Sequence, residues 1–186
     1  MMTSTNSLAP RRTRLVACVA LTLALVSCSK PATTEGPRLE LSPEAQSSID
    51  RALAAYDDVR SKLASDQVAA VSDDAQRLGQ AAADASKSAP PSLHATLESL
   101  STAAAGLQSA NPDDPDAVRG AFGEVSRAAI ALVAADSRLS DGRYVYECSM
   151  AEGYGKWLQT SDKVANPYMG SRMLECGSEV AWDANP

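Results

Sequence analysis

The chain ends with two segments, Tyr144-Val-Tyr-Glu-Cys-Ser-Met150 and Met173-Leu-Glu-Cys-Gly177, that differ in kind from everything before them. The sequence from Tyr144 onward holds two of the four cysteines, three of the five methionines, both tryptophans and four of the five tyrosines. Aromatic residues make up only 4% of the chain. This concentration marks residues 141–186 as a separate C-terminal cap, and we look for the chemistry of the protein there.

The spacing of cysteine and methionine within the cap predicts two pairs. Alternation over 144–150 indicates an extended strand, which would place Cys148 and Met150 on one face together with two tyrosines. Met173 and Cys176 are three residues apart, so one helical turn would bring both to the same side. The two pairs could converge into a cluster of four sulfur atoms.

Two alternatives follow for these sulfur atoms, and they exclude each other. Thiolates and thioethers are soft ligands that suit Cu(I) or Ag(I), and they would form a metal site of Cys148, Met150, Met173 and Cys176. Zinc usually requires histidine or more cysteine, and the single histidine lies at a helix start. Alternatively, Cys148 and Cys176 form a disulfide, the ordinary state of two cysteines outside the cytoplasm, which would stabilise the fold by roughly 3–4 kcal/mol.

The N-terminus has the features of an export signal. Residues 1–27 combine a basic segment (Arg11-Arg-Thr-Arg14) with an apolar run from Leu15 to Val26 that is too short to span a bilayer, where about 20 residues are needed. The following Leu25-Val-Ser-Cys28 resembles a bacterial lipobox, so we expect Cys28 to become the lipidated first residue. Ser29 then favours the outer membrane over the inner, and residues 28–41 form a flexible tether.

Residues 42–140 contain four amphipathic segments. Ser42-Pro-Glu44 and Asp114-Pro115 each combine a capping residue with a proline at a helix start. Asp66 and Ser92 offer caps for the two helices between them. Short connections between four helices predict an all-α fold, an antiparallel up-down four-helix bundle on which the small strand-and-loop cap packs as part of one domain.

The composition and the helical part point away from several classes of function. A formal net charge of −6 argues against nucleic acid as a partner. The adjacent acids Asp57-Asp58 and Asp73-Asp74 diverge around a helix, which is typical of a solvated face. No acid–base pair, nucleophile motif or phosphate-binding loop is present in the sequence, so we do not expect an enzyme.

Several motifs of the cap resemble a bacterial family of unknown function. They are Cys148-Ser-Met150, Trp157-Leu-Gln159, Asn166-Pro-Tyr168 with Gly170, Met173-Leu-Glu-Cys-Gly177, and in the first helix Tyr56 with a Leu63-Ala-Ser-Asp66 turn. Members of that family occur fused to, or encoded beside, periplasmic adaptors of copper/silver efflux pumps. Two positions depart from its pattern, because Glu147 stands where histidine is common and Ser149 where proline is.

These observations lead to one expectation and one alternative. We expect a lipoprotein of the cell envelope, on the periplasmic side, that is anchored in the bilayer through Cys28 and binds Cu(I) or Ag(I) at the cap. The resemblance implies components of a metal efflux system as partners. The alternative is a non-metal interaction module held by a Cys148–Cys176 disulfide.

Overall fold

The computed structural model of the protein describes Met1 and residues 38–182. The predicted signal peptide, the predicted lipidation site Cys28 and most of the predicted tether lie outside the described residues. Within residues 38–182 the helices are α1 (Pro43–Ala64), α2 (Ser72–Ser88), α3 (His94–Gln108), α4 (Pro115–Ala134) and the short α5 (Ser137–Ser140), and the strands are β1 (Tyr144–Glu147), β2 (Lys156–Gln159) and β3 (Ser178–Val180). Single 3-10 turns occur at Val68–Ala70, Pro91–Leu93 and Gly170–Arg172. No helix in this part of the chain is long and apolar enough to cross a membrane.

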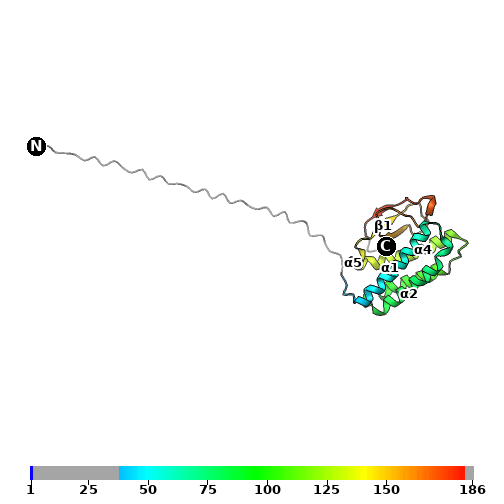
Figure 1. The fold of residues 1–186 in the computed structure, drawn as a ribbon, viewed down its shortest axis with the longest axis horizontal. Coiled ribbons are helices and arrows are strands. Elements are labelled where there is room, and N and C mark those ends of the chain that lie inside the picture. The colour runs from blue at the N-terminus through cyan, green and yellow to red at the C-terminus, as the bar shows by residue number, and fades with distance from the viewer. Residues whose placement is uncertain (2–37, 183–186) are drawn as a thin grey trace. The chain divides into compact units, whose positions relative to one another are not determined.

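The prediction of an all-α four-helix bundle is wrong, because the described chain is a mixed α and β fold. Its helices lie side by side, and the strands and loops lie together on one side of them (Figure 1). Helices α1 and α2, α2 and α3, and α3 and α4 pack extensively on one another. The backbones of α1 and α4 lie close at few positions, and these two helices meet mainly through long side chains such as Tyr56, Phe122 and Arg119. The bundle is not closed by its first and last helices, because strand β2 packs on α4 and part of the cap fills the space beside α1.

The capping residues define some helix starts as the sequence predicts and not others. The Ser42 hydroxyl accepts a hydrogen bond from the N–H of Ala45, and the Asp114 carboxylate accepts one from Ala117, each at 3.1 Å. Asp66 and Ser92 do not act as caps, because α2 and α3 begin further along the chain, each after a 3-10 turn. Asp66 instead adopts a left-handed conformation, with φ of 57°, and has a different role.

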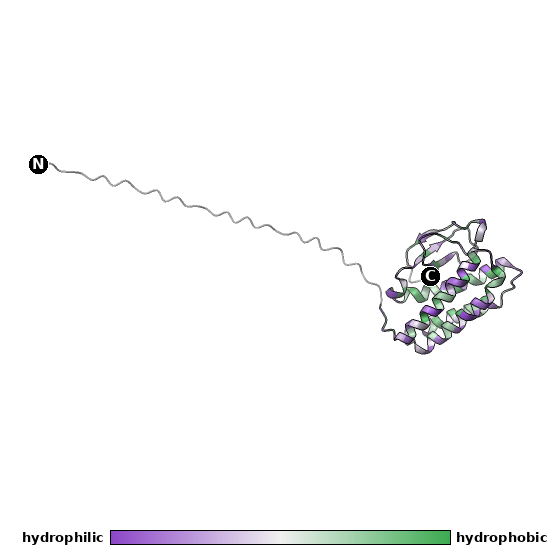
Figure 2. Ribbon diagram, viewed as in Figure 1, coloured by the Kyte–Doolittle hydropathy of each residue, from purple (hydrophilic) through white to green (hydrophobic). Residues whose placement is uncertain are grey.

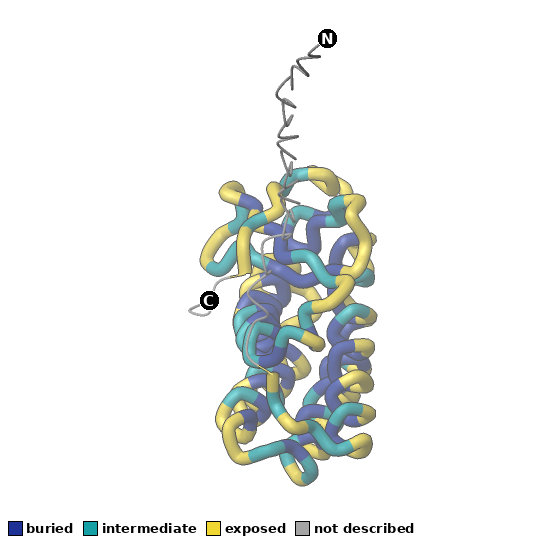
Figure 3. Tube along the Cα trace, turned by 90° about the vertical axis from the view of Figure 1, so that its left-hand side faces the viewer, coloured by how far each residue is buried: buried dark blue, intermediate teal, exposed yellow. Residues whose placement is uncertain are grey.

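The helices bury one face built from alanine, leucine and valine. Figure 2 shows apolar and polar residues alternating around each helix, and Figure 3 shows buried residues continuing from the helices into the cap. Ala75, Leu78 and Ala82 of α2 and Leu97 and Leu100 of α3 are fully buried. Small side chains let these helices approach closely, and burial of apolar surface is the main source of their stability.

One of the four acids predicted to lie on solvated helix faces, Asp74, is buried instead. Asp74 is fully buried at the start of α2, where it forms ion pairs with Lys62 of α1 and with Arg77. A buried carboxylate is stable only when it is paired in this way. This cluster therefore fixes the start of α2 against the end of α1.

The three strands form an antiparallel sheet in the order β2-β1-β3. Tyr146 of β1 pairs with Trp157 of β2, and Glu147 of β1 pairs with Ser178 of β3. β1 and β2 are adjacent in sequence, whereas β3 returns from the far end of the cap. The pairing of β1 with β3 therefore brings the two ends of the cap together.

A continuous row of aromatic rings joins the sheet to the helices. Phe122 of α4 lies 5.6 Å from the Tyr56 ring and 5.5 Å from the Tyr168 ring, measured between centroids. Trp157 continues the row between Tyr168, at 6.1 Å, and Tyr146, at 5.7 Å. All five rings are buried. The aromatic residues concentrated in the cap thus form the core between sheet and helices.

Polar contacts fix the position of the cap as well. The Tyr56 hydroxyl lies 2.8 Å from the Ser126 hydroxyl and accepts a hydrogen bond from the N–H of Leu158 at 3.0 Å. Since Tyr56 belongs to α1, Ser126 to α4 and Leu158 to β2, one side chain links three elements. All three groups are buried, so loss of any partner would leave an unsatisfied polar atom.

A second polar junction connects the turn after α1 with the loop before β3. The buried Arg119 guanidinium of α4 donates to the carbonyl oxygens of Leu63 and Pro167 and to the Asp66 carboxylate, at 2.7–3.2 Å. Asp66 also accepts a hydrogen bond from the N–H of Ser171 at 2.9 Å. This junction, formed by Arg119, Asp66 and Ser171, explains why Asp66 does not cap a helix.

Candidate functional site

The two cysteines of the cap meet at the end of the sheet. Cys148 directly follows β1, and Cys176 lies two residues before β3, so the pairing of these strands brings both close together. Their sulfur atoms are 2.7 Å apart, and both are described as thiols. Sulfur atoms are about 2.05 Å apart in a disulfide, whereas two thiolates at 2.3 Å from a tetrahedral ion would be about 3.8 Å apart. The observed separation is nearer to that of a cross-link.

The two cysteines differ in exposure. Cys148 is 2% exposed and belongs to the core, whereas Cys176 is half-buried. Cys176 also lines a shallow surface hollow of about 480 Å³ together with Met173, Leu174 and Glu175. Solvent and dissolved reagents therefore reach the pair from the side of Cys176.

Asn166 is the residue that positions Cys176, and it is itself fully buried. Its side-chain oxygen accepts hydrogen bonds from the N–H groups of Tyr168 and Met169, at 2.8 and 3.1 Å. Its amide nitrogen donates to the Cys176 carbonyl oxygen at 2.6 Å. The sequence identifies Asn166 only as a turn residue before proline, and its contact with Cys176 could not be predicted from spacing.

The glycine after Cys176 is required by close packing. A Cβ atom at Gly177 would lie 2.6 Å from the Trp157 ring, closer than any side chain tolerates. The chain therefore passes directly over the buried tryptophan before β3. Trp157 in turn donates its ring N–H to the side chain of Gln159 at 2.9 Å, and Gln159 holds the loop 161–165 through three further hydrogen bonds. Trp157, Gln159 and Gly177 thus fix the backbone around the sulfur pair.

The surroundings of the two thiols favour different protonation states. Burial raises the pKa of Cys148, but hydrogen bonds from the Cys176 thiol, the Met150 N–H, the Asn166 amide and the Ala151 N–H outweigh it and lower the pKa below its ordinary value. The hydrogen bond to Cys148 raises the pKa of Cys176. In the reduced pair, Cys148 is therefore the more acidic thiol of the two.

The two methionines of the predicted metal site lie at the surface. Met150 is 61% exposed, because β1 ends at Glu147 and the chain turns, with the Ala151 N–H bonded to the Cys148 carbonyl oxygen at 3.1 Å. Met173 is 40% exposed and follows the 3-10 turn, with its carbonyl oxygen bonded to the Cys176 N–H at 3.0 Å. The predicted common strand face of Cys148 and Met150 is therefore wrong. Both thioethers are nevertheless accessible next to the cysteines in sequence.

Exposed large hydrophobic side chains are otherwise rare. Within residues 38–182 there are four, Met150, Met173, Leu174 and Trp182, and all belong to the cap. Single exposed apolar side chains are common, but several in one region can mark a binding surface. This distribution places the accessible apolar surface of the described chain in the same region as the sulfur pair.

No other group of side chains in the described ranges competes as a metal site. Residues 38–182 contain no group of three or more His, Cys, Asp or Glu side chains that could hold a metal ion. His94 is exposed at the start of α3, with its ring nitrogen 3.0 Å from the Ala89 carbonyl oxygen. Besides the two thiols, the exposed methionines Met150 and Met173 are the soft side chains of the cap that could serve as ligands.

A larger hollow lies on the helices, and one of its lining residues, Arg127, stacks on the Tyr154 ring of the cap at 4.2 Å from the centroid. It has a volume of about 1080 Å³ between α3 and α4, and most of its lining residues are alanine, serine, threonine and glycine. Its charged lining residues are Glu98, Glu124 and Arg127, of which the last two form an ion pair at 3.5 Å. This hollow contains no cysteine, histidine or convergent set of acids, so we assign no chemistry to it.

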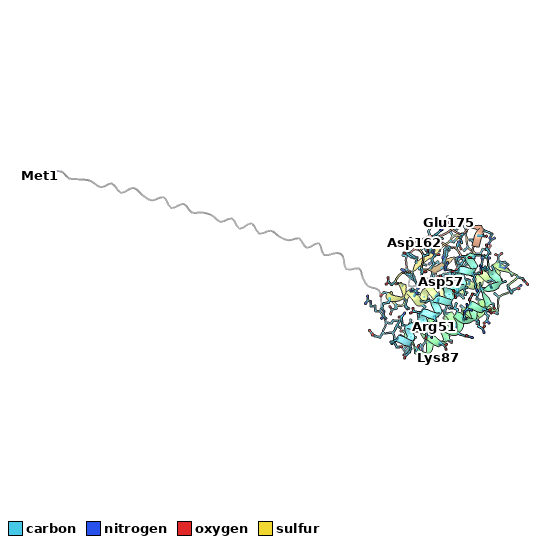
Figure 4. All side chains as sticks on the ribbon, viewed as in Figure 1. Met1, Arg51, Asp57, Lys87, Asp162 and Glu175 are labelled. Atoms are coloured by element: carbon cyan, nitrogen blue, oxygen red, sulfur yellow. The ribbon has the colours of Figure 1, made fainter. Side chains whose placement is uncertain are left out.

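One acidic side chain, Glu175, lines the surface hollow beside Cys176. Glu175 adjoins Cys176 in sequence, and Figure 4 shows Glu175 and Asp162 on the cap, while Arg51 and Lys87 lie on the helical part.

Comparison of the chain with known protein families, characterised proteins and solved structures found no match. The family resemblance therefore rests on the motifs quoted above alone.

Proposed function

We propose that this chain is a cell-envelope lipoprotein whose cap binds a soft monovalent metal ion, Cu(I) or Ag(I). The observation that carries the proposal is the meeting of Cys148 and Cys176, with an accessible methionine near each in sequence, Met150 and Met173. The cargo would be held by the two sulfur atoms of the cysteines and by one or both thioethers.

The chemistry of the donors fits such an ion. Thiolate and thioether ligands select Cu(I), whereas calcium and magnesium need oxygen ligands and structural zinc usually needs four cysteine or histidine ligands. A metal binds thiolates, so both protons must leave: the lowered pKa of Cys148 favours this, whereas the raised pKa of Cys176 opposes it.

To bind an ion together, the two cysteine sulfur atoms must move apart. Two thiolates that share an ion lie roughly 1 Å further apart than the two sulfur atoms of this pair. Cys148 is buried, so the adjustment falls to Cys176, which lies between the exposed Glu175 and the half-buried Gly177. The reduced pair is therefore the metal-binding form.

Anchoring and partners complete the proposal. A lipid on Cys28 would hold the protein on the periplasmic side of the envelope, with Ser29 favouring the outer membrane. The family resemblance supports periplasmic components of a metal efflux system as partners. In that setting the protein would sequester the ion or deliver it to the efflux system.

The second candidate is a non-metal interaction module that a Cys148–Cys176 disulfide stabilises. The 2.7 Å separation of the sulfur atoms favours it, because only a small movement would form the bond. The disulfide would then hold Met150 and Met173, on the two segments that it joins, in a fixed apolar surface for a protein partner.

Metal analysis of the full-length protein, purified without oxygen and loaded with Cu(I), tests the first candidate. We expect about one copper ion per chain in the reduced protein and none after oxidation to the disulfide. Changing Met150 and Met173 together to leucine should weaken Cu(I) binding by at least about tenfold without loss of stability, because leucine has nearly the same volume.

The matched control is Met169→Leu, since Met169 lies in the same cap but is half-buried away from the two cysteines in sequence. It should leave Cu(I) affinity unchanged. Absence of copper from the reduced protein would refute the metal proposal. Absence of free thiols in protein taken directly from the envelope would favour the second candidate.

A further inference from the structure

The two sulfur atoms of the pair are accessible to different degrees. Cys148 is 2% exposed in the core, while Cys176 lines the surface hollow with Met173, Leu174 and Glu175. A nucleophile attacks a disulfide in line with the sulfur–sulfur bond, at the sulfur that it can reach. Only the side of Cys176 offers such an approach from solvent.

The position of Cys148 makes it the sulfur that would be displaced. It is buried behind Cys176, whose sulfur atom lies 2.7 Å away. The Ala151 N–H bonds to the Cys148 carbonyl oxygen, and the Asn166 amide bonds to the Cys176 carbonyl oxygen, so both cysteines are fixed by their backbones. Attack from solvent at Cys176 would therefore break the bond to a cysteine that stays in place in the core.

We propose that the oxidised pair takes part in thiol–disulfide exchange, in which an external protein dithiol attacks Cys176 and displaces Cys148. This activity goes beyond the proposed metal binding and does not depend on it. It requires only that Cys148 and Cys176 form a disulfide when an external disulfide oxidises them by removing two electrons and two protons.

The exchange proceeds in two balanced steps. The thiolate of the external dithiol forms a bond to the Cys176 sulfur, the Cys148–Cys176 bond breaks, and its electron pair remains on Cys148 as a thiolate. The second thiol of the partner then loses its proton and attacks the partner's own sulfur in the mixed disulfide. Cys176 leaves with the electron pair and is protonated, so two electrons have passed from the partner to this chain.

The hollow also indicates what kind of partner would approach. Met173 and Leu174 are each 40% exposed, and Glu175 adds a negative charge beside Cys176. A dithiol flanked by apolar residues and a positive charge would match this surface. Reduction by such a partner would convert the chain from the cross-linked form to the dithiol form.

The test uses the full-length protein, oxidised and free of metal, with reduced glutathione as a monothiol probe. After a short reaction the mixture is quenched with acid, free thiols are alkylated, and the modified cysteines are identified by mass spectrometry. We expect glutathione on Cys176 and the alkyl group on Cys148, with an excess of at least about tenfold over the opposite pattern.

Two single variants provide an independent measurement. Cys148→Ser leaves Cys176 as the reactive thiol, and Cys176→Ser leaves Cys148, each in the folded chain. The first variant should react with an aromatic disulfide reagent at least about tenfold faster than the second, and the difference should disappear after denaturation.

The outcomes separate this inference from the metal proposal. Glutathione mainly on Cys148, or equally on both cysteines, overturns it. So does a disulfide that glutathione reduces only after denaturation, or a pair that stays as two thiols in an oxidised glutathione buffer. Copper content is measured on the reduced protein, so failure to bind copper would have no bearing on which cysteine the thiol attacks.

Discussion

The helical region (residues 38–140) and the described part of the cap (residues 141–182) are packed in different ways. The helical region buries alanine, leucine and valine along regular helix faces. The cap has only three short strands, and it is held by aromatic rings and by side chains that bond to the backbone, such as Asn166 and Gln159. Regular helices need few specific residues, whereas an irregular segment needs many.

This difference explains where the unusual residues of the sequence belong. Rings from the cap fill the space beside α1 and α4, so the tyrosines and Trp157 serve packing. Sulfur is the other unusual element of the cap, and it lies at the rim of the sheet, where Cys176 reaches the surface. Aromatic and sulfur-containing residues are both concentrated in the cap, but they have separate roles.

The largest expected effect tests whether the two regions form one cooperative unit. Trp157→Ala should lower the free energy of unfolding by about 3–5 kcal/mol, because the fully buried ring packs between Tyr146 and Tyr168. Denaturant unfolding followed by circular dichroism and by tyrosine fluorescence measures this loss. The two signals should change together, since the cap fills the open side of the helical region.

Trp182→Ala is the matched control, because Trp182 is 37% exposed at the edge of the described chain. Its effect should stay within about 0.5 kcal/mol. If Trp157→Ala unfolds the cap while the helical signal remains, the helical region folds without the cap, and the two regions are not one cooperative unit.

A medium effect tests the junction between the two regions. Gly170 has φ of 57°, and a Cβ atom there would collide with the Asp66 carboxylate that Arg119 and Ser171 hold. Gly170→Ala should therefore cost about 2–3 kcal/mol in denaturant unfolding, from backbone strain and from loss of these hydrogen bonds.

Gly106→Ala provides the opposite control in the helical region. A Cβ atom at Gly106 meets no atom within 4 Å, and alanine favours a helix interior, so this change should stabilise the protein by about 0.5–1 kcal/mol. Equal effects of the two substitutions would show that the junction does not constrain Gly170.

The contrast between the regions also explains what could be predicted from the sequence. Helix faces repeat with a fixed period, and proline with Ser42 or Asp114 marks a start, so the positions of the main helices follow from local pattern. The way in which the bundle is closed does not follow from local pattern. It depends on long-range packing of Tyr168 against Phe122 and of Trp157 against Tyr168, which a local sequence period does not predict.

The candidate site was predictable to a similar extent. The residue types of Cys148 and Cys176 indicate sulfur chemistry, but the 2.7 Å contact depends on the pairing of β1 with β3, a strand of three residues without a sequence signal. The exposure of Met150 depends on where β1 ends. Asp66 shows the same limit, because its bond to the distant Ser171 displaces the local role of a helix cap.

The smallest expected effect concerns a junction within the helical region itself, where residue 39 meets the end of α4. The buried Asp136 accepts hydrogen bonds from the N–H of Leu39 and from Arg138, each at 2.8 Å, and pairs with the Arg138 guanidinium at 2.7 Å. The hydrogen bonds from Arg138 lower the pKa of Asp136 to about 2, against the opposing effect of burial. Because the folded-state pKa is depressed, the stabilisation is present above the unfolded value near 4 and is lost as the pH falls from about 4 to 2.

Asp136→Asn should lower the free energy of unfolding by about 1–2 kcal/mol at pH 6 and by almost nothing at pH 2. The value at pH 6 is reduced because the Arg138 side chain is half-exposed and solvent screens its charge. Urea unfolding of both proteins at the two pH values measures the difference, and a gap of equal size at both would show that the charge of Asp136 contributes nothing to holding Leu39.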